Sequence, residues 1–186
     1  GLTGLANRAR LMEHLNAAGA RARRSASPSP SFARMMLDVD RFKEINDAVD
    51  IAGGDVVLRE IANRIHDALR EGDLLGRLAG DEFAMALVDI TNLGDVMAFM
   101  NRLIEALRRP FHVGDKDLVC TTSVGIALAP GDGDTAPIVL RHAAIALARA
   151  KSDGGQRMCF FEQSMDKALQ RRRLVEHELR LALSRD

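Results

Sequence analysis

Residues 74–88 read LLGRLAGDEFAMALV, two apolar runs on either side of the turn Gly80-Asp81. Short apolar runs broken by a glycine and an acid are typical of two antiparallel strands joined by a tight connection. We therefore predict strands at Leu74–Ala79 and Phe83–Val88. The earlier stretch FARMMLDV, at Phe32–Val39, shows no polar alternation. This absence indicates a central strand that is covered on both faces.

Apolar residues at helical spacing separate these strands and predict helices that pack on them. The expected helices cover 7–22, 41–50, a segment after Asp55 that ends at Gly72, 96–107 and 138–151, and two further strands are expected at 117–129 and 158–161. This order of elements predicts an α+β fold: a central, mainly antiparallel five-stranded sheet flanked by helices.

Length and charge narrow the possible functions. The chain has 186 residues, with 26 basic and 26 acidic side chains and neither Trp nor Tyr. A zero net charge argues against a general nucleic-acid-coating role, and the lack of these aromatic residues argues against a base-stacking platform. Cys120 and Cys159 lack metal-site spacing, so we expect reduced thiols in a cytoplasmic protein. No apolar run reaches the length of a membrane helix, so we expect no membrane contact by this fragment, although the parent protein can be anchored elsewhere.

Composition changes near Glu162. We expect a globular domain over 1–162 and a charged helix over 163–186 that links it to a downstream domain. The chain starts abruptly at Gly1, as a fragment of a longer protein would.

Acidic residues mark two of the predicted strand ends. Asp38 and Asp40 flank Val39, so alternation places both carboxylates on one side. Carboxylates beside an exposed carbonyl suit Mg²⁺, and helix capping by one of them is the alternative. Asp81 and Glu82 lie in the turn, where solvated acids are common. If this turn neighbours Asp38, the clustered carboxylates require divalent cations, as two-metal nucleotidyl transfer does.

The stretch FKEIND, at 42–47, adds groups that suit a nucleotide. Lys43 can meet phosphate, Asn46 can bind a purine edge, and Asp55 can accept hydrogen bonds from guanine. On residue types alone, helix-terminal acids and an Asx-turn are the preferred interpretation.

Several ordered motifs together resemble the GGDEF domain of diguanylate cyclases. They are D-x-D-x-F-K-x-I-N-D from Asp38, A-G-D-E-F from Ala79, L-T-G-L-x-N-R from Leu2, S-V-G-I-A from Ser123, and the helix Ala143–Lys151. The resemblance covers residues 1–162. The charged tail resembles the helix that joins this domain to a phosphodiesterase (EAL) domain, so we expect a piece of a GGDEF–EAL protein with a sensor domain.

The resemblance implies a fold similar to the palm of nucleotidyl cyclases and polymerases. It also implies condensation of two GTP into cyclic di-GMP by a homodimer with Mg²⁺ or Mn²⁺. The resemblance assigns the metal ligands to Asp38, Asp81 and the Val39 carbonyl. It implies that Glu82 aids activation of the attacking hydroxyl. The residues that it implies for GTP binding are Gly80, Lys43, Asn46, Asp55 and Lys151.

An inhibitory product site is also implied. The family often carries R-x-x-D before the signature turn, here Arg70 to Asp73, and Arg102 is the best-placed second arginine. Arginine can grip phosphate or a guanine edge bidentately. The alternative is a basic helix end that only complements the helix dipole.

The chain departs from the family pattern at peripheral positions. Ala79, Ala144 and Ala148 replace the usual Gly, Asp and Tyr, and Asp50-Ile51 replaces Gly-His. Gly155 stands where an arginine would bind the terminal phosphate, and we expect it to tolerate a side chain better than Gly154, which should form the turn. These departures keep open an alternative function: a catalytically weak or inactive module that binds GTP or cyclic di-GMP and regulates an attached EAL domain.

Overall fold

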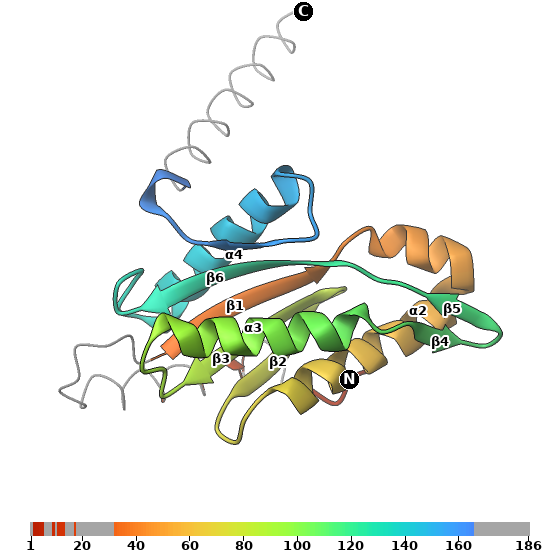
Figure 1. The fold of residues 1–186 in the computed structure, drawn as a ribbon, viewed down its shortest axis with the longest axis horizontal. Coiled ribbons are helices and arrows are strands. Elements are labelled where there is room, and N and C mark those ends of the chain that lie inside the picture. The colour runs from red at the N-terminus through yellow and green to blue at the C-terminus, as the bar shows by residue number, and fades with distance from the viewer. Residues whose placement is uncertain (1, 6–8, 10, 14–16, 18–31, 166–186) are drawn as a thin grey trace, which may run out of the picture.

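The strand β1 (Phe32–Val39) lies at the centre of the structure, with all eight residues buried. The computed structural model describes residues 2–5, 9, 11–13, 17 and 32–165 (Figure 1). After β1 the elements are α2 (Phe42–Ala68), β2 (Leu74–Ala79), β3 (Glu82–Val88), α3 (Leu93–Arg108), β4 (Phe111–Val113), β5 (Lys116–Leu118), β6 (Thr122–Ala129), α4 (Ala136–Ser152) and β7 (Met158–Phe160).

The main sheet has five strands in the order β2-β3-β1-β6-β7. The pairs β2–β3, β3–β1 and β1–β6 are antiparallel, and only β6–β7 is parallel. The predicted α+β class with a mainly antiparallel five-stranded sheet is therefore confirmed.

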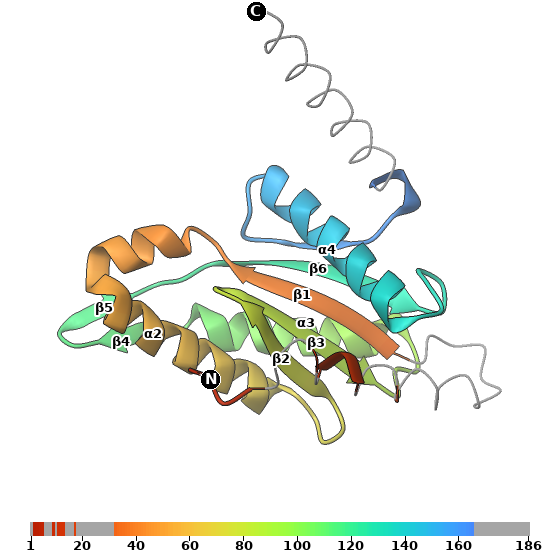
Figure 2. The ribbon, with the colours of Figure 1, turned by 180° about the vertical axis from the view of Figure 1, so that it is seen from behind.

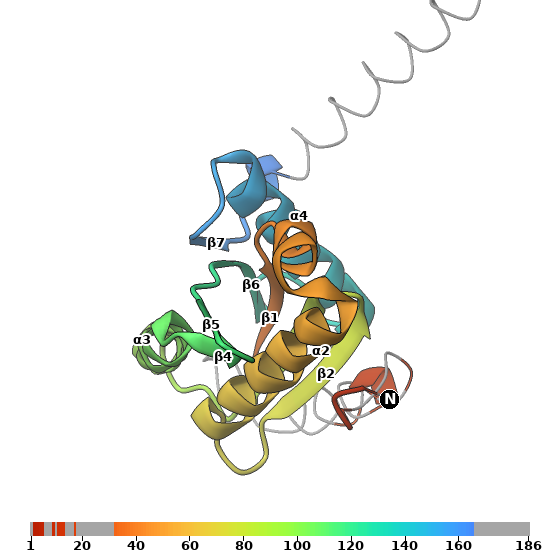
Figure 3. The ribbon, with the colours of Figure 1, turned by 90° about the vertical axis from the view of Figure 1, so that its right-hand side faces the viewer.

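Alternate residues of β1 enter two separate cores, which is why the strand has no polar side. Met35 and Leu37 pack with α2 and α3, whereas Phe32 and Met36 pack with α4. Figure 3 views the sheet close to edge-on, with α3 on one side and α4 on the other. The contact with α4 is close because Gly125 of β6 lies under the helix backbone. A Cβ built at Gly125 would lie 2.1 Å from the Ala143 carbonyl oxygen, so only glycine fits there.

One predicted strand and two predicted helices are wrong in their bounds. The predicted strand 117–129 is divided: β6 begins at Thr122, and Lys116–Leu118 forms a separate hairpin with Phe111–Val113. The two predicted helices after β1 follow one another directly within α2, bent at Asp50, whose φ is 63° and ψ 178°. Figure 2 shows the bend beside the β4–β5 hairpin, and Lys116 Nζ donates to the Ala48 carbonyl there at 2.6 Å.

Several expectations fall at the ends of the chain. The predicted helix 7–22 lies mostly outside the described residues, as does the charged segment after Met165. Both cysteines are free thiols, as expected. Within the described ranges, no helix combines the length and the apolar character needed to cross a membrane.

Candidate active site

The site forms where β1 ends between two neighbouring strands. In the strand registers Asp38 lies opposite Glu82 on β3 and Ser123 on β6. Directly opposite residues of antiparallel strands point to the same face of a sheet. These three side chains therefore share the face that α4 covers.

Asp38 is almost fully buried, and its partner is a lysine at the end of α4. Lys151 Nζ lies 2.6 Å from Asp38 Oδ2. Burial raises the pKa of the Asp38 carboxyl; the hydrogen bond and charge of Lys151 lower it, and the nearby charges of Asp81 and Glu82 raise it further. The structure thus brings the predicted acids and one predicted phosphate-binding lysine together, but the Asp38–Lys151 ion pair was not predicted.

The turn between β2 and β3 leaves open space above its glycine. Gly80 has a φ of 52°, and no heavy atom lies within 4 Å of the position that a Cβ would occupy. Arg77 Nε donates to the Gly80 carbonyl at 2.7 Å, which fixes the turn. This open backbone beside Asp81 agrees with the expectation that a ligand can lie against Gly80.

One of the predicted guanine-binding residues, Asn46, lies across the bend in α2 against Gly54, the residue before Asp55. A Cβ at Gly54 would lie 1.8 Å from Asn46 Oδ1, so the Asn46 amide lies directly on the glycine backbone. Asp55 follows Gly54 and is half-buried. The carboxylate of Asp50 accepts a hydrogen bond from Gly53 N at 2.8 Å and caps the second part of the helix. Lys43 lies exposed in the first turn of α2.

Asp73, predicted as part of an inhibitory site, has a structural role in this conformation. Its carboxylate accepts from Arg70 N at 2.9 Å and from Val88 N at 3.0 Å. Arg102 donates to the Ala68 carbonyl at 3.1 Å, so it lies at the same end of α2. The side chain of Arg70 is exposed. The helix ends before Leu69, so the predicted C-cap role of Gly72 is wrong.

Two features near Lys151 differ from expectation. Asp40 does not join Asp38 as a second open carboxylate, because both its oxygens accept hydrogen bonds from Ser123 and Gln156. Gly155 has a φ of 73°, and a Cβ there would lie 3.1 Å from Asp40 Oδ1. A Cβ at Gly154, whose φ is 108°, would approach only the Arg157 guanidinium, at 3.7 Å, so the expectation that Gly155 tolerates a side chain better than Gly154 is wrong.

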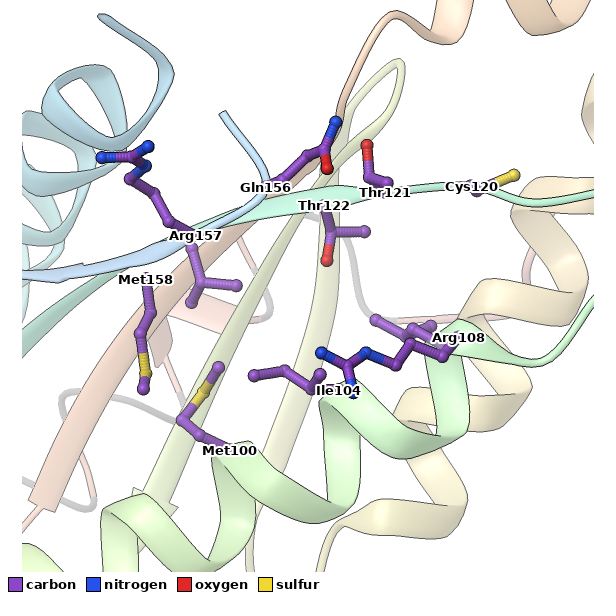
Figure 4. Close-up of a pocket in the computed structure, with 11 residues that line it drawn as sticks. Met100, Ile104, Arg108, Cys120, Thr121, Thr122, Gln156, Arg157 and Met158 are labelled. Atoms are coloured by element: carbon purple, nitrogen blue, oxygen red, sulfur yellow. The ribbon is translucent and has the colours of Figure 1, made fainter. Parts of the chain in front are cut away.

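A cavity of about 190 Å³ lies on the opposite face of β6, between α3 and β7 (Figure 4). Met100, Ile104 and Met158 form its apolar wall, and the Thr122 hydroxyl and the Arg108 guanidinium point into it. The cavity is separated from Asp38 and Lys151 by the sheet itself.

Comparison with known proteins agrees with the motifs. Residues 1–157 match the family described as diguanylate cyclase, GGDEF domain. The chain is 36% identical over 184 residues to the bifunctional diguanylate cyclase/cyclic di-GMP phosphodiesterase MucR of Pseudomonas aeruginosa, over 99% of this chain and 26% of that protein. It is 39% identical over 161 residues to the diguanylate cyclase TpbB of the same species, over 84% of this chain and 36% of that protein.

Solved structures show the same domain. The GGDEF domain of TpbB (YfiN) from Pseudomonas aeruginosa superposes with a TM-score of 0.86 at 35% identity, covering 91% of this chain and 98% of that one. The GGDEF domain of DgcB from Caulobacter crescentus, solved in complex with c-di-GMP, superposes with a TM-score of 0.75 at 28% identity, covering 86% of this chain and 93% of that one. The chain spans about a quarter of the length of the first curated relatives it matches. The chain belongs to the GGDEF domain family of diguanylate cyclases, which are nucleotidyltransferases.

Proposed function

We propose that this domain condenses two GTP molecules into cyclic di-GMP, with two copies of the domain each presenting one GTP. The observation that carries the proposal is the convergence of Asp38, Asp81 and Glu82 beside Lys151 at one edge of the sheet. Asp81 and Glu82 raise the pKa of the buried Asp38 carboxyl, and such a placement of acids is costly unless cations neutralise it, which favours a catalytic role over a purely structural one.

The donor set fits a divalent metal ion that is shared with a substrate. Among the described residues, no group of three or more His, Cys, Asp or Glu side chains is placed to hold a metal ion by itself. Mg²⁺ commonly takes one or two carboxylates, waters and substrate phosphates, so an open set is what this chemistry requires. Asp38, Asp81 and the Val39 carbonyl would hold Mg²⁺ or Mn²⁺, which would stabilise charge at the α-phosphate and lower the pKa of the attacking hydroxyl.

The remaining residues orient the nucleotide. Asn46 and Asp55 would bind the guanine edge, and the open backbone at Gly80 would lie against the nucleotide. Lys43 and Lys151 would neutralise the phosphates. Glu82 would accept the proton of a 3′-hydroxyl as its oxygen bonds to the α-phosphorus of the facing GTP and pyrophosphate leaves.

Product inhibition is part of the same proposal. Arg70 and Arg102 would bind cyclic di-GMP at the end of α2, where Asp73 holds the turn. Arginine suits this role because its planar fork can contact a phosphate or a guanine edge with two hydrogen bonds.

A second function has its own support. Gly155 supplies no cation for the phosphates, and Lys151 is paired with Asp38. One relative, 34% identical over 189 residues, is named the cyclic di-GMP phosphodiesterase NbdA. The domain would then bind GTP or cyclic di-GMP and regulate an attached EAL domain. For the parent protein we propose covalently linked EAL and sensor domains and a cytoplasmic location.

One assay separates the two functions. Purified protein is first freed of bound product and then incubated with Mg²⁺ and GTP, and cyclic di-GMP is measured. The cyclase predicts product formation that Asp81→Asn removes. The regulatory module predicts nucleotide binding without product.

A further inference from the structure

Asp40 joins two parts of the chain that lie far apart in the sequence. Its Oδ1 accepts from Ser123 Oγ at 2.6 Å, its Oδ2 accepts from Gln156 N at 3.0 Å, and its backbone N donates to the Thr121 carbonyl at 2.9 Å. Figure 4 shows Gln156 and Thr121 side by side at the start of β6. Because both carboxylate oxygens already have donors, this side chain acts as a connector and not as an open metal ligand.

The segment held by Asp40 is the short connection between α4 and β7. Gly154, Gly155 and Gln156 have φ values of 108°, 73° and 55°, so the backbone turns sharply there. At the helix end Gly154 N donates to the Lys151 carbonyl at 3.1 Å, and at the strand end Val124 N donates to the Arg157 carbonyl at 2.9 Å. A displacement of Gln156 would therefore be transmitted to the last turn of α4.

The fit around Gly155 makes this connection specific. A Cβ at that position would lie 3.1 Å from Asp40 Oδ1 and 3.4 Å from Ser123 Oγ. The absence of a side chain thus lets the backbone approach the Asp40 carboxylate closely enough for Gln156 N to reach it.

Lys151 stands immediately before this turn and is held in two ways. Asp38 contacts its ammonium directly, and Asp40 holds its backbone through the turn. We propose that Asp40 is a positioning residue that fixes the end of α4 so that the Lys151 ammonium meets the nucleotide phosphates. The inference rests on the proposed function. The positioning by Asp40 matters most when Asp38 takes part in the nucleotide site, because the direct pair between Asp38 and Lys151 is then lost and the link through Asp40 remains.

The primary test is Asp40→Asn, which keeps the size of the side chain. An amide has one oxygen, one NH2 group and no charge. It either loses the bond from Gln156 N or keeps it as a weaker neutral bond while its NH2 donates to Ser123 Oγ. Titration with an α,β-methylene GTP analogue and Mg²⁺ should show affinity weakened about tenfold, the effect of one lost charge-assisted contact. Guanosine, which has no phosphates, should bind as it does to the parent protein. Asp67→Asn, which removes the same charge from an exposed position of α2, should change neither affinity.

A double-mutant cycle separates positioning from general support of the fold. In a Lys151→Ala background, Asp40→Asn should change affinity for the analogue by less than about twofold, because the ammonium that it positions is gone. An undiminished tenfold loss in that background, or an equal loss of guanosine binding, would overturn the inference. If Asp40→Asn does not fold, Ser123→Ala removes one arm of the link and is taken through the same cycle.

Hydrogen exchange in the nucleotide-free protein provides a readout that does not depend on the proposed function. Asp40→Asn should speed exchange at Gln156 and the neighbouring amides of 153–157, with β1 unchanged. Unchanged exchange at Gln156 would overturn the inference even if the parent binds nucleotide. A parent protein that binds no GTP analogue would instead refute the proposed function, and the exchange comparison would still decide whether Asp40 holds the turn.

Discussion

The ammonium nitrogen of Lys151 lies 2.6 Å from a carboxylate oxygen of Asp38, which joins the end of α4 to the end of β1. The Asp38 side chain is 6% exposed and that of Lys151 44% exposed. A buried carboxylate next to two other acids needs a cation, and this lysine supplies it. In the proposed function, a nucleotide must therefore compete for Lys151 with an acid that the fold has already buried.

This pair gives stability a specific pH dependence. The pKa of Asp38 is raised, chiefly by burial, above its ordinary value of 3.8, so the folded state binds the proton more tightly than the unfolded state. Its contribution to the free energy of unfolding should therefore rise as pH falls through the folded-state pKa towards 3.8. Lys151→Ala removes the interactions that lower this pKa, so it should lose stability at pH 7 and recover part of it as the solution is acidified.

Thermal unfolding at several pH values checks this effect. Asp38→Asn in the same Lys151→Ala background should abolish the recovery, since the amide does not titrate. A recovery that persists with Asn at position 38 would place the titrating group elsewhere.

Asp81→Asn should abolish Mg²⁺-dependent GTP turnover and leave the melting temperature equal or higher. Asp81 raises the pKa of Asp38, so neutralising it relieves repulsion in the folded state. Turnover and thermal melting are measured on one preparation. Near-full cyclase activity in this variant would exclude Asp81 as a metal ligand.

Arg70→Ala should weaken cyclic di-GMP binding at least about tenfold and leave the initial cyclase rate unchanged, because one charge-assisted contact is worth about 1.5–3 kcal/mol. Calorimetry measures the affinity. Asp73→Ala is predicted to behave differently, because it also removes the acceptor for Arg70 N and Val88 N and should cost about 1–3 kcal/mol of folding free energy. If Arg70→Ala binds cyclic di-GMP as tightly as the parent protein, the segment from Arg70 to Asp73 has only a structural role.

The free energy of unfolding should fall in the order Asp50→Gly, the parent protein with Asp50, and Asp50→Ala. Glycine adopts the φ of 63° and ψ of 178° found at this position without strain, and relief of that strain should gain about 1–3 kcal/mol. Glycine in a capping position costs only a few tenths of a kcal/mol, whereas alanine loses the bond to Gly53 N and keeps the strain. Urea unfolding of the two variants and the parent gives the ranking, and an Ala variant more stable than Gly would contradict it.

Arg64→Ala should lower the free energy of unfolding by about 3 kcal/mol, since it leaves several carbonyls unsatisfied and removes a stacked cation. The guanidinium donates to the carbonyls of Ala106, Arg109 and Pro110 and lies over the Phe111 ring, 3.9 Å from its centroid. Arg59→Ala, on the same helix but exposed, serves as the matched control. Equal denaturation midpoints for the two variants would refute this role of Arg64.

Local patterns predicted the sheet strands well where burial alone sets the pattern. β1, β2 and β3 have apolar runs that end at charged or glycine-containing turns, and their bounds were predicted to within one residue. The strand predicted over 117–129 failed because the apolar run Leu118-Val119-Cys120 reads as part of a continuous strand, although pairing with β1 starts only at Thr122. Alternation does not reveal which strand is the partner. The signal that was missed is the Gly114-Asp115 turn between β4 and β5, the same residue types as the Gly80-Asp81 turn between β2 and β3.

Motifs selected several residues that the structure brings together, among them Asp38, Asp81 and Lys151, but the contacts between them were not predicted. Motifs identified the acids, the lysines and Asn46. The bonds from Asp40 to Ser123 and Gln156 span 83 and 116 positions, and the Asp38–Lys151 pair depends on how α4 lies on the sheet. Such contacts follow from strand order and helix packing, which no local spacing encodes.

The position of Asp38 between Glu82 and Ser123 has a consequence for folding. These three residues belong to strands that are distant in the chain, and the pairing of β1 with β6 closes a long loop before its contacts give any stabilisation. No local hairpin or helix can therefore hold a working part of the site while the rest of the sheet is unfolded. Nucleotide binding should appear only with the complete sheet, so a destabilising substitution far from the acids would reduce apparent affinity in proportion to the folded fraction.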